Sequence, residues 1–96
     1  MAADQLWLSA NYGRDGIGLH FTWRQDQPAV EAILPLLEAE LAPFAARPHW
    51  GKLFDAGAAA VAPLYPRFND FIALAERLDP SGKLRNGFLD RTVFGS

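Results

Sequence analysis

The stretch IGLHFTWR, residues 17–24, alternates strictly between large apolar side chains and small or polar ones. A period of two is typical of a β-strand with one buried face, because successive side chains point to opposite sides. The preceding loop NYGRDG (residues 11–16) is rich in the Asn, Asp and Gly that reversals use, and LWLS (residues 6–9) is a second short apolar run. The sequence therefore predicts an antiparallel hairpin with helices packed on its apolar face, an α+β fold.

Beyond residue 24 the apolar spacing changes to that of helices. Asp26 followed by Pro28 is a typical helix start, and Pro35 lies on the polar side of the apolar stripe, so we expect a bend there rather than a break. Three helices are expected, over about residues 26–44, 55–64 and 66–78. The tail from Lys83 onward has no clear period.

Composition excludes several classes of function. The chain has 96 residues, half of them hydrophobic, which fits one small globular domain. A net charge of -2 argues against a nucleic-acid binder, and the absence of cysteine together with only two histidines argues against a disulfide framework or a metal site. No apolar run reaches the roughly 20 residues of a membrane span, and no secretory leader is present, so we expect a cytoplasmic protein.

Three polar groups are candidates for binding chemistry. His20 and Thr22 fall on the same face of the predicted strand, roughly 7 Å apart, and Gly18 leaves room beside them, an arrangement that suits a polyol or sugar. The alternative is a histidine on the wet side of a sheet. Lys52, beside Trp50, would stabilise a developing alkoxide if it were held in a partly dry pocket, or it is an ordinary loop lysine over a buried indole.

A further stretch, LDPSGKLRN (residues 78–86), reads as a helix stop and a turn. Its Lys83 and Arg85 either bind a phosphate or a partner domain, or stand in solvent. No glycine-rich phosphate loop and no serine nucleophile motif is found in the sequence.

Four stretches occur in an order that is fairly specific: HFTW (20–23), RPHWGK (47–52), YPRF (65–68) and LDPSGKLRN (78–86). Together they resemble the C-terminal end of the bacterial alditol (xylitol) oxidases. These are grouped with sugar-lactone oxidases such as D-arabinono-1,4-lactone oxidase in the vanillyl-alcohol-oxidase class of flavoproteins. The resemblance implies that residues 1–96 are the C-terminal part of a substrate-binding cap domain, plus a tail returning toward an FAD domain that lies outside this chain.

The resemblance also implies an activity: FAD-dependent oxidation of the C1 hydroxyl of an alditol such as xylitol, or of a sugar lactone, with O2 reduced to H2O2. The positions that match His20 and Thr22 line the substrate pocket in the family, and the position that matches Lys52 contacts the reacting end. His20 and Lys52 are therefore the predicted catalytic residues, whereas His49 is expected to be structural. The family's Glu-x-Arg pair and flavin-linked histidine would lie upstream, so the chain alone is expected to be inactive, and no residue here is assigned to FAD.

Two other classes remain open. One is a stand-alone polyol-binding or sugar-binding module, and the other is a structural interaction domain in which His20 and Lys52 are incidental. The sequence does not specify which polyol or lactone is the substrate. Because an uncovered sheet edge pairs readily with another chain, the isolated chain is expected to form a dimer or larger assembly.

Overall fold

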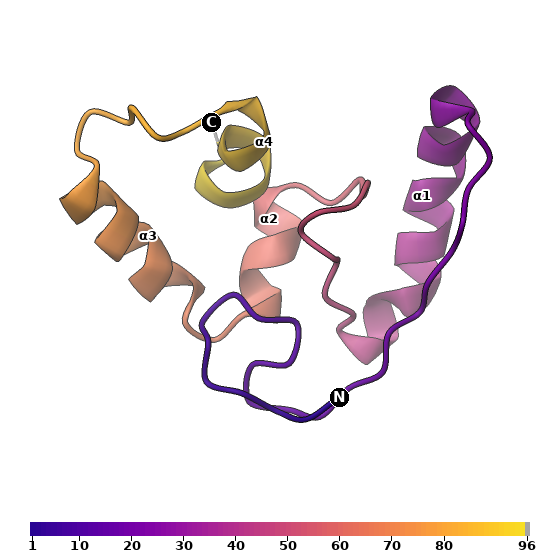
Figure 1. Ribbon diagram of the computed structural model, residues 1–96, viewed down its shortest axis with the longest axis horizontal. Helices are drawn as coiled ribbons and strands as arrows, with labels where there is room; N and C mark the ends of the chain where they lie inside the picture. Colours follow the sequence, from indigo (N-terminus) through magenta and orange to yellow (C-terminus); the bar gives the residue numbers. More distant parts are fainter. Residues whose placement is uncertain (96) are drawn as a thin grey trace.

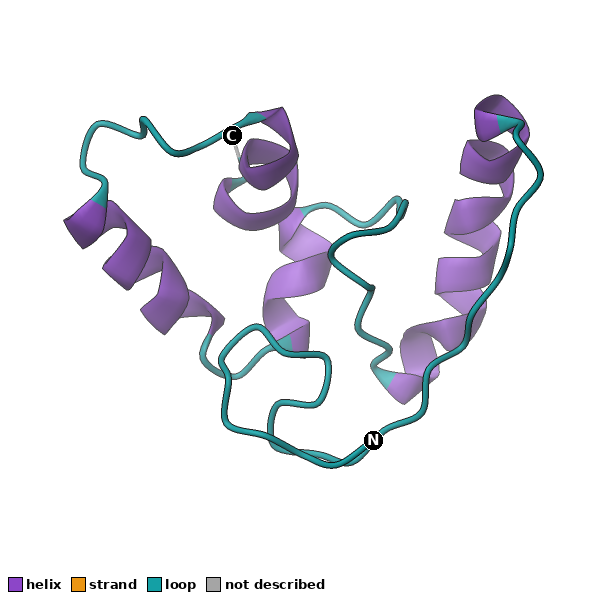
Figure 2. Cartoon of the chain, viewed as in Figure 1, coloured by secondary structure: helices purple, strands orange, loops and turns teal. Residues whose placement is uncertain are grey.

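The computed structural model describes residues 1–95, and over these residues the regular structure is helical (Figures 1 and 2). The α-helices are α1 (Gln27–Leu41), α2 (Ala58–Val61), α3 (Phe68–Leu78) and α4 (Gly87–Leu89). Shorter segments continue three of them: 3₁₀ turns η1 (Ala42–Phe44) and η2 (Ala62–Leu64), and a π-helical turn η3 (Asp90–Phe94). Residues 1–26 form loops and an extended segment.

The predicted α+β fold with an antiparallel hairpin is wrong. The described residues contain no sheet, and their β-pairing is limited to one isolated bridge between Asp4 and Tyr12. The first expected strand, residues 6–9, curls into turns because the Asp4 carboxylate accepts hydrogen bonds from the Leu6 amide and the Ser9 hydroxyl.

The second expected strand, residues 17–24, is not helical, but it does not pair with another strand either. No backbone hydrogen bond joins residues 17–23 to any other segment that the structure describes. A period of two specifies which side chains share a face, but a strand forms only where a neighbour supplies N–H and C=O groups. The segment also lacks the buried apolar face that the alternation predicted, because Ile17, Leu19, Phe21 and Trp23 are all exposed.

The helices follow their predicted starts and stops more closely. Asp26 caps α1 by accepting a 3.3 Å hydrogen bond from the Ala29 amide, and the helix continues through the exposed Pro35. The expected third helix is confirmed as α3. The pair α4 and η3 was not predicted, because three residues of helix started by an Asn86 cap leave no periodic signal.

The hydrophobic core lies where α2, η2, η3 and the start of α3 meet. Its buried apolar side chains are Phe54, Val61, Tyr65, Phe68 and Val93. Trp50 stacks on Tyr65 with ring centroids 5.7 Å apart, so the aromatic cluster extends from the core to the loop before α2. This cluster is the platform on which the turn bearing Lys52 rests.

Helix α1 lies at one side of the molecule, with the extended segment after residue 16 running beside it (Figure 1). Only Val30 and Leu34 of this helix are buried. The Glu38 carboxylate attaches the helix to the loop before α2, because it accepts hydrogen bonds from the amides of Asp55 (2.6 Å) and Ala56 (2.8 Å). None of the helices within residues 1–95 has the length and apolar character to cross a membrane.

Candidate functional site

Two of the predicted site residues meet in the structure. The Lys52 ammonium nitrogen lies 3.3 Å from Nε2 of His20, although the two residues are 32 positions apart in the chain. Both side chains are exposed, so the partly dry pocket expected around the lysine is not formed by the described residues. The pair is instead a polar contact on an open surface.

A tight turn presents Lys52. Its amide donates to the His49 carbonyl at 3.1 Å, and the Gly51 amide donates to Nδ1 of the His49 imidazole at 3.0 Å. A Cβ at Gly51 would lie only 3.2 Å from that ring, so glycine permits the close approach. His49 thus shapes the turn, in agreement with the structural role predicted for it.

Trp50 fixes the same turn to the rest of the molecule. Its indole N–H donates a 2.8 Å hydrogen bond to the carbonyl of Leu8, and its ring packs on Tyr65 and, edge to face, on Phe54. Trp50 is partly buried, so the sequence alternative of an exposed lysine above a buried indole is correct for the lysine and only in part for the indole. What it omits is the histidine that faces the ammonium.

The contact between Lys52 and His20 limits which atom of the pair donates the hydrogen bond. An ammonium has only donors, so in a hydrogen bond with it Nε2 of His20 is the acceptor. Two N–H groups of the ammonium then remain to bind a hydroxyl oxygen. The ammonium thus offers donors and a positive charge on the open surface.

Thr22 lies two residues beyond His20 on the same extended segment and is exposed. Within residues 1–95 its hydroxyl makes no hydrogen bond, and the structure does not bring it into contact with Lys52. Gly18 is exposed as well. That the imidazole and the hydroxyl share a face stays a prediction from the alternation.

Sequence analysis assigned no role to Arg47, which the structure places between three segments. The guanidinium donates to the carbonyls of Leu64 (2.8 Å) and Tyr12 (2.8 Å), and its carbon lies 5.0 Å from the centre of the Tyr65 ring. Burial lowers the pKa of Arg47, as does the neighbouring charge of Arg14, and burial raises the pKa of Tyr65. In the sequence, the position of Arg47 between Ala46 and Pro48 was the one sign that its guanidinium is partly buried.

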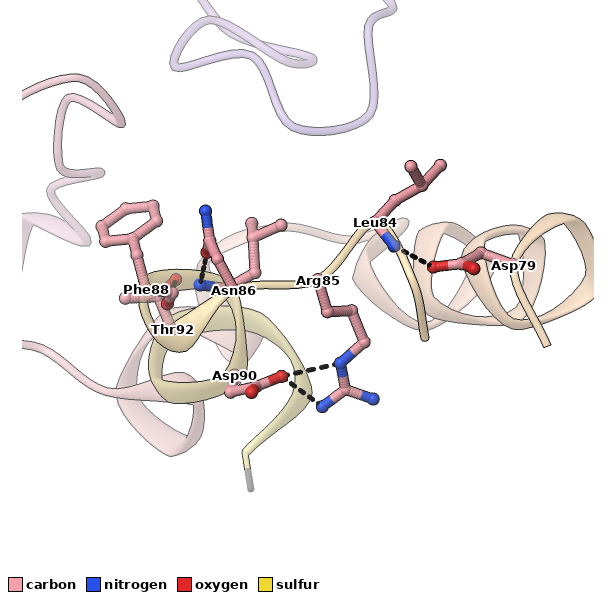
Figure 3. Close-up of polar contacts among 8 residues, drawn as sticks. Asp79, Leu84, Arg85, Asn86, Phe88, Asp90 and Thr92 are labelled. Carbon is pink, nitrogen blue, oxygen red and sulfur yellow. Dashed lines mark hydrogen bonds and ion pairs between the residues drawn. The ribbon is translucent and has the colours of Figure 1, made fainter. Parts of the chain in front are cut away.

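The stretch at residues 78–86 is structural (Figure 3). The Asp79 carboxylate accepts hydrogen bonds from the amides of Lys83 and Leu84, both at 2.9 Å, which closes the turn after α3. Arg85 pairs with Asp90 at 2.5 Å and lies 4.0 Å over the Phe94 ring. Its charge therefore serves the attachment of the tail, and Lys83 stays exposed.

The other surfaces of the described chain do not add to this site. Two shallow hollows are found, one beside Ile17 and one beside Arg85, and neither is lined by His20, Thr22 or Lys52. Among residues 1–95 no group of three metal-ligating side chains gathers in one place.

Comparison with known proteins gives the chain its family. The sequence pattern of D-arabinono-1,4-lactone oxidase matches residues 1–92, nearly the whole chain. The chain belongs to the D-arabinono-1,4-lactone oxidase family. Its membership agrees with the resemblance carried by the four ordered motifs.

Individual relatives support the same family. The chain is 52% identical over 89 residues to an alditol oxidase from a Streptomyces species, covering 93% of this chain and 21% of the relative. It is 33% identical over 94 residues to an L-gulono-1,4-lactone dehydrogenase of Mycobacterium tuberculosis and 28% identical over 95 residues to an L-gulonolactone oxidase of Mus musculus, covering 96% and 95% of this chain. Each of these matches spans 21% of the relative, so the chain corresponds to about a fifth of their length. The names of these relatives make the family one of oxidoreductases.

Proposed function

We propose that residues 1–96 are the C-terminal part of the substrate-binding domain of an FAD-dependent oxidase. Its reaction is oxidation of the C1 hydroxyl of an alditol such as xylitol, or of a sugar lactone, by O2 to give H2O2. The observation that carries this proposal is the 3.3 Å contact of Lys52 with His20, in a chain 52% identical to an alditol oxidase. The identity favours a polyol over a lactone.

The described residues supply the binding of one substrate oxygen. The two N–H groups of Lys52 that do not face His20 donate to the hydroxyl that is oxidised, and the exposed Thr22 hydroxyl is available to a neighbouring oxygen of a polyol. The hydroxyl proton and the hydride pass to acceptors outside the described residues. As negative charge grows on the oxygen, a fixed ammonium stabilises it more than it stabilises the neutral substrate. The chain therefore contributes position and charge.

FAD does not fit the described residues. A dinucleotide pyrophosphate typically sits at a helix start preceded by glycines. Here α1 starts at Asp26, whose carboxylate already occupies the amide of Ala29, and α3 starts at Arg67. We therefore assign FAD to a domain outside this chain and derive no step through it. We also place the enzyme in the cytoplasm, because a small cysteine-free chain lacks the disulfides that secreted domains of this size use.

A segment exchange tests the proposal. In the Streptomyces alditol oxidase, the 89 residues that match this chain are replaced by the corresponding residues of this chain. The hybrid is expected to retain flavin absorbance and to release H2O2 when xylitol is added. A control hybrid with His20→Ala and Lys52→Ala is expected to keep the flavin and to lose xylitol-dependent H2O2.

A hybrid that is folded and flavin-loaded but inactive with polyols and lactones would contradict the proposal. Calorimetry on the isolated chain separates the alternatives. Saturable binding of xylitol to this chain without the rest of the oxidase would favour a stand-alone binding module.

We further propose that the isolated chain associates with a second copy through residues 17–24. The apolar face of this segment is open to solvent, with Ile17 86% exposed, Leu19 62%, Phe21 46% and Trp23 40%. An antiparallel pair of two such segments centred on His20 sets Ile17 opposite Trp23 and Leu19 opposite Phe21. All eight apolar side chains then share one face, and the backbone groups that face the partner segment become hydrogen-bonded.

Light scattering at several concentrations is expected to give a dimer or larger assembly for the unaltered chain. Leu19→Lys is expected to shift it to monomer, since it places a charge on each copy within the shared apolar face. Leu84→Lys, at a position 81% exposed and far along the chain, is the matched control and should leave the assembly unchanged. A monomeric unaltered chain, or a dimer that survives Leu19→Lys, would refute self-pairing through this segment.

A further inference from the structure

The contact between His20 and Lys52 joins two segments that lack regular secondary structure. Residues 17–23 make no backbone hydrogen bond to another described segment, and Lys52 ends a four-residue turn. Exposed polar contacts contribute little free energy on their own. The 3.3 Å separation must therefore be set by whatever holds the two segments beneath the pair.

Arg47, at the start of the stretch that carries Lys52, contacts the N-terminal loop that precedes residues 17–23. Its Nε donates to the Leu64 carbonyl at 2.8 Å, while its Nη1 donates to the carbonyls of Tyr12 at 2.8 Å and Ala10 at 3.2 Å. The planar guanidinium lies over the buried Tyr65 ring. A rigid fork that reaches two segments at once fixes their relative position, which a single flexible ammonium does not.

Trp50 provides a second attachment to the same N-terminal loop. Its indole N–H donates to the Leu8 carbonyl at 2.8 Å, and its ring stacks on the Tyr65 ring. The turn at residues 47–52 is thus attached at two points to residues 8–12. Lys52 belongs to this turn.

The N-terminal loop carries this attachment toward His20. Hydrogen bonds from Gly13 to the Asp4 carbonyl (2.9 Å), from Asp4 to the Asn11 carbonyl (3.0 Å) and from the Ala3 amide to the Asp15 carboxylate (2.8 Å) close residues 3–15 on themselves. A closed loop moves as a unit. Any shift of the loop at Tyr12 is therefore passed to the extended segment that begins at Ile17.

We infer that Arg47 is a positioning residue for the pair: it sets the distance between the Lys52 ammonium and the His20 imidazole by fixing the turn on the N-terminal loop. It acts indirectly, since its guanidinium donates to the carbonyls of Leu64 and Tyr12 and packs on Tyr65. The inference rests on the proposed role of the pair in binding substrate. The distance between positions 20 and 52, on which it depends, can be measured without any substrate.

The absence of cysteine from the sequence makes a clean distance measurement possible. A chain with His20→Cys and Lys52→Cys carries only these two thiols, and a short bis-maleimide joins them at a rate that reports their proximity. Adding Arg47→Met is expected to lower the rate of intramolecular cross-linking about tenfold, because misplacement of about an ångström strongly reduces the effective concentration of paired groups. Arg77→Met, at an exposed position on α3, is the matched control and should leave the rate unchanged.

Circular dichroism of each variant separates misplacement from unfolding. If Arg47→Met unfolds the chain, Arg47→Lys and Trp50→Phe provide the test, since each keeps most of the packing and removes one attachment. Both are expected to slow cross-linking in a folded chain. An unchanged rate in folded Arg47→Met, or in both folded milder variants, would overturn the inference.

The hybrid oxidase gives a second measurement. There, Arg47→Lys is expected to lower kcat more than it raises KM for xylitol, because a displaced ammonium loses more in the transition state than in substrate binding. The two proposals fail separately. Unchanged cross-linking contradicts the positioning role, whereas unchanged xylitol turnover after loss of Lys52 contradicts the proposed function.

Discussion

Lys52→Met in the hybrid oxidase is expected to lower kcat/KM for xylitol by about 100- to 1,000-fold, the usual consequence of removing one donor from a developing oxyanion. Methionine keeps the length of the side chain and removes the charge. The turn beneath it is held by His49 and Trp50, neither of which contacts the Lys52 ammonium, so the backbone should not move. Steady-state H2O2 release at varied xylitol concentration measures the change.

Lys83→Met is the matched control. This lysine is also exposed, and only its backbone amide takes part in the turn at Asp79, so the substitution should leave kcat/KM unaffected. Flavin absorbance of both variants verifies that the protein is loaded. A Lys52→Met hybrid that turns over xylitol at the unaltered rate would remove the pair from the catalytic machinery.

Tyr65→Ala is expected to cost about 3–5 kcal/mol of unfolding free energy, as other large aromatic deletions from a core do. The ring is 2% exposed and contacts Trp50, Phe68 and the Arg47 guanidinium. The total stability of a small domain is only about 5–15 kcal/mol, so this loss is a large part of it. Urea unfolding followed by circular dichroism measures the loss.

Tyr65→Phe isolates the ring from the hydroxyl. The Tyr65 hydroxyl oxygen is buried and has no hydrogen-bond partner among residues 1–95, since the nearby indole of Trp50 donates to Leu8 instead. Removing it should therefore leave stability unchanged or raise it. A loss comparable to that of Tyr65→Ala would show that the hydroxyl, and not the ring, stabilises the core.

The difference in stability between the unaltered chain and Tyr65→Phe is expected to depend on pH, and its sign follows from the pKa of Tyr65. Burial raises the pKa of Tyr65 above its ordinary value of 10.0, so the native state holds this proton more tightly than the unfolded state does. The contribution of this group to stability is complete below pH 10.0 and is lost as the pH rises through the raised pKa. Above pH 10.0 the unaltered chain should therefore lose stability more steeply than Tyr65→Phe in the same urea series. Parallel pH profiles would contradict this assignment.

Prediction from sequence succeeded where the determining groups are near one another in the chain. The start of α1 depends on Asp26 and the amide three residues on, and the stop of α3 depends on Asp79 and the amides of residues 83 and 84. The ordered motifs likewise indicated the family, which the match over residues 1–92 confirmed. The catalytic roles of His20 and Lys52 and the substrate-binding role of Thr22 stay predictions, although the structure brings His20 and Lys52 together.

By itself the sequence determined the start of α1, the end of α3 and the family, because caps and motifs consist of neighbouring residues. Only the tertiary structure decided that residues 17–24 stay unpaired and that Arg47 joins the turn at Lys52 to the loop before His20. The physical reason is the same in both cases. The hydrogen-bond partners of an extended backbone and of a guanidinium lie tens of residues away, and no local pattern specifies where folding will place them.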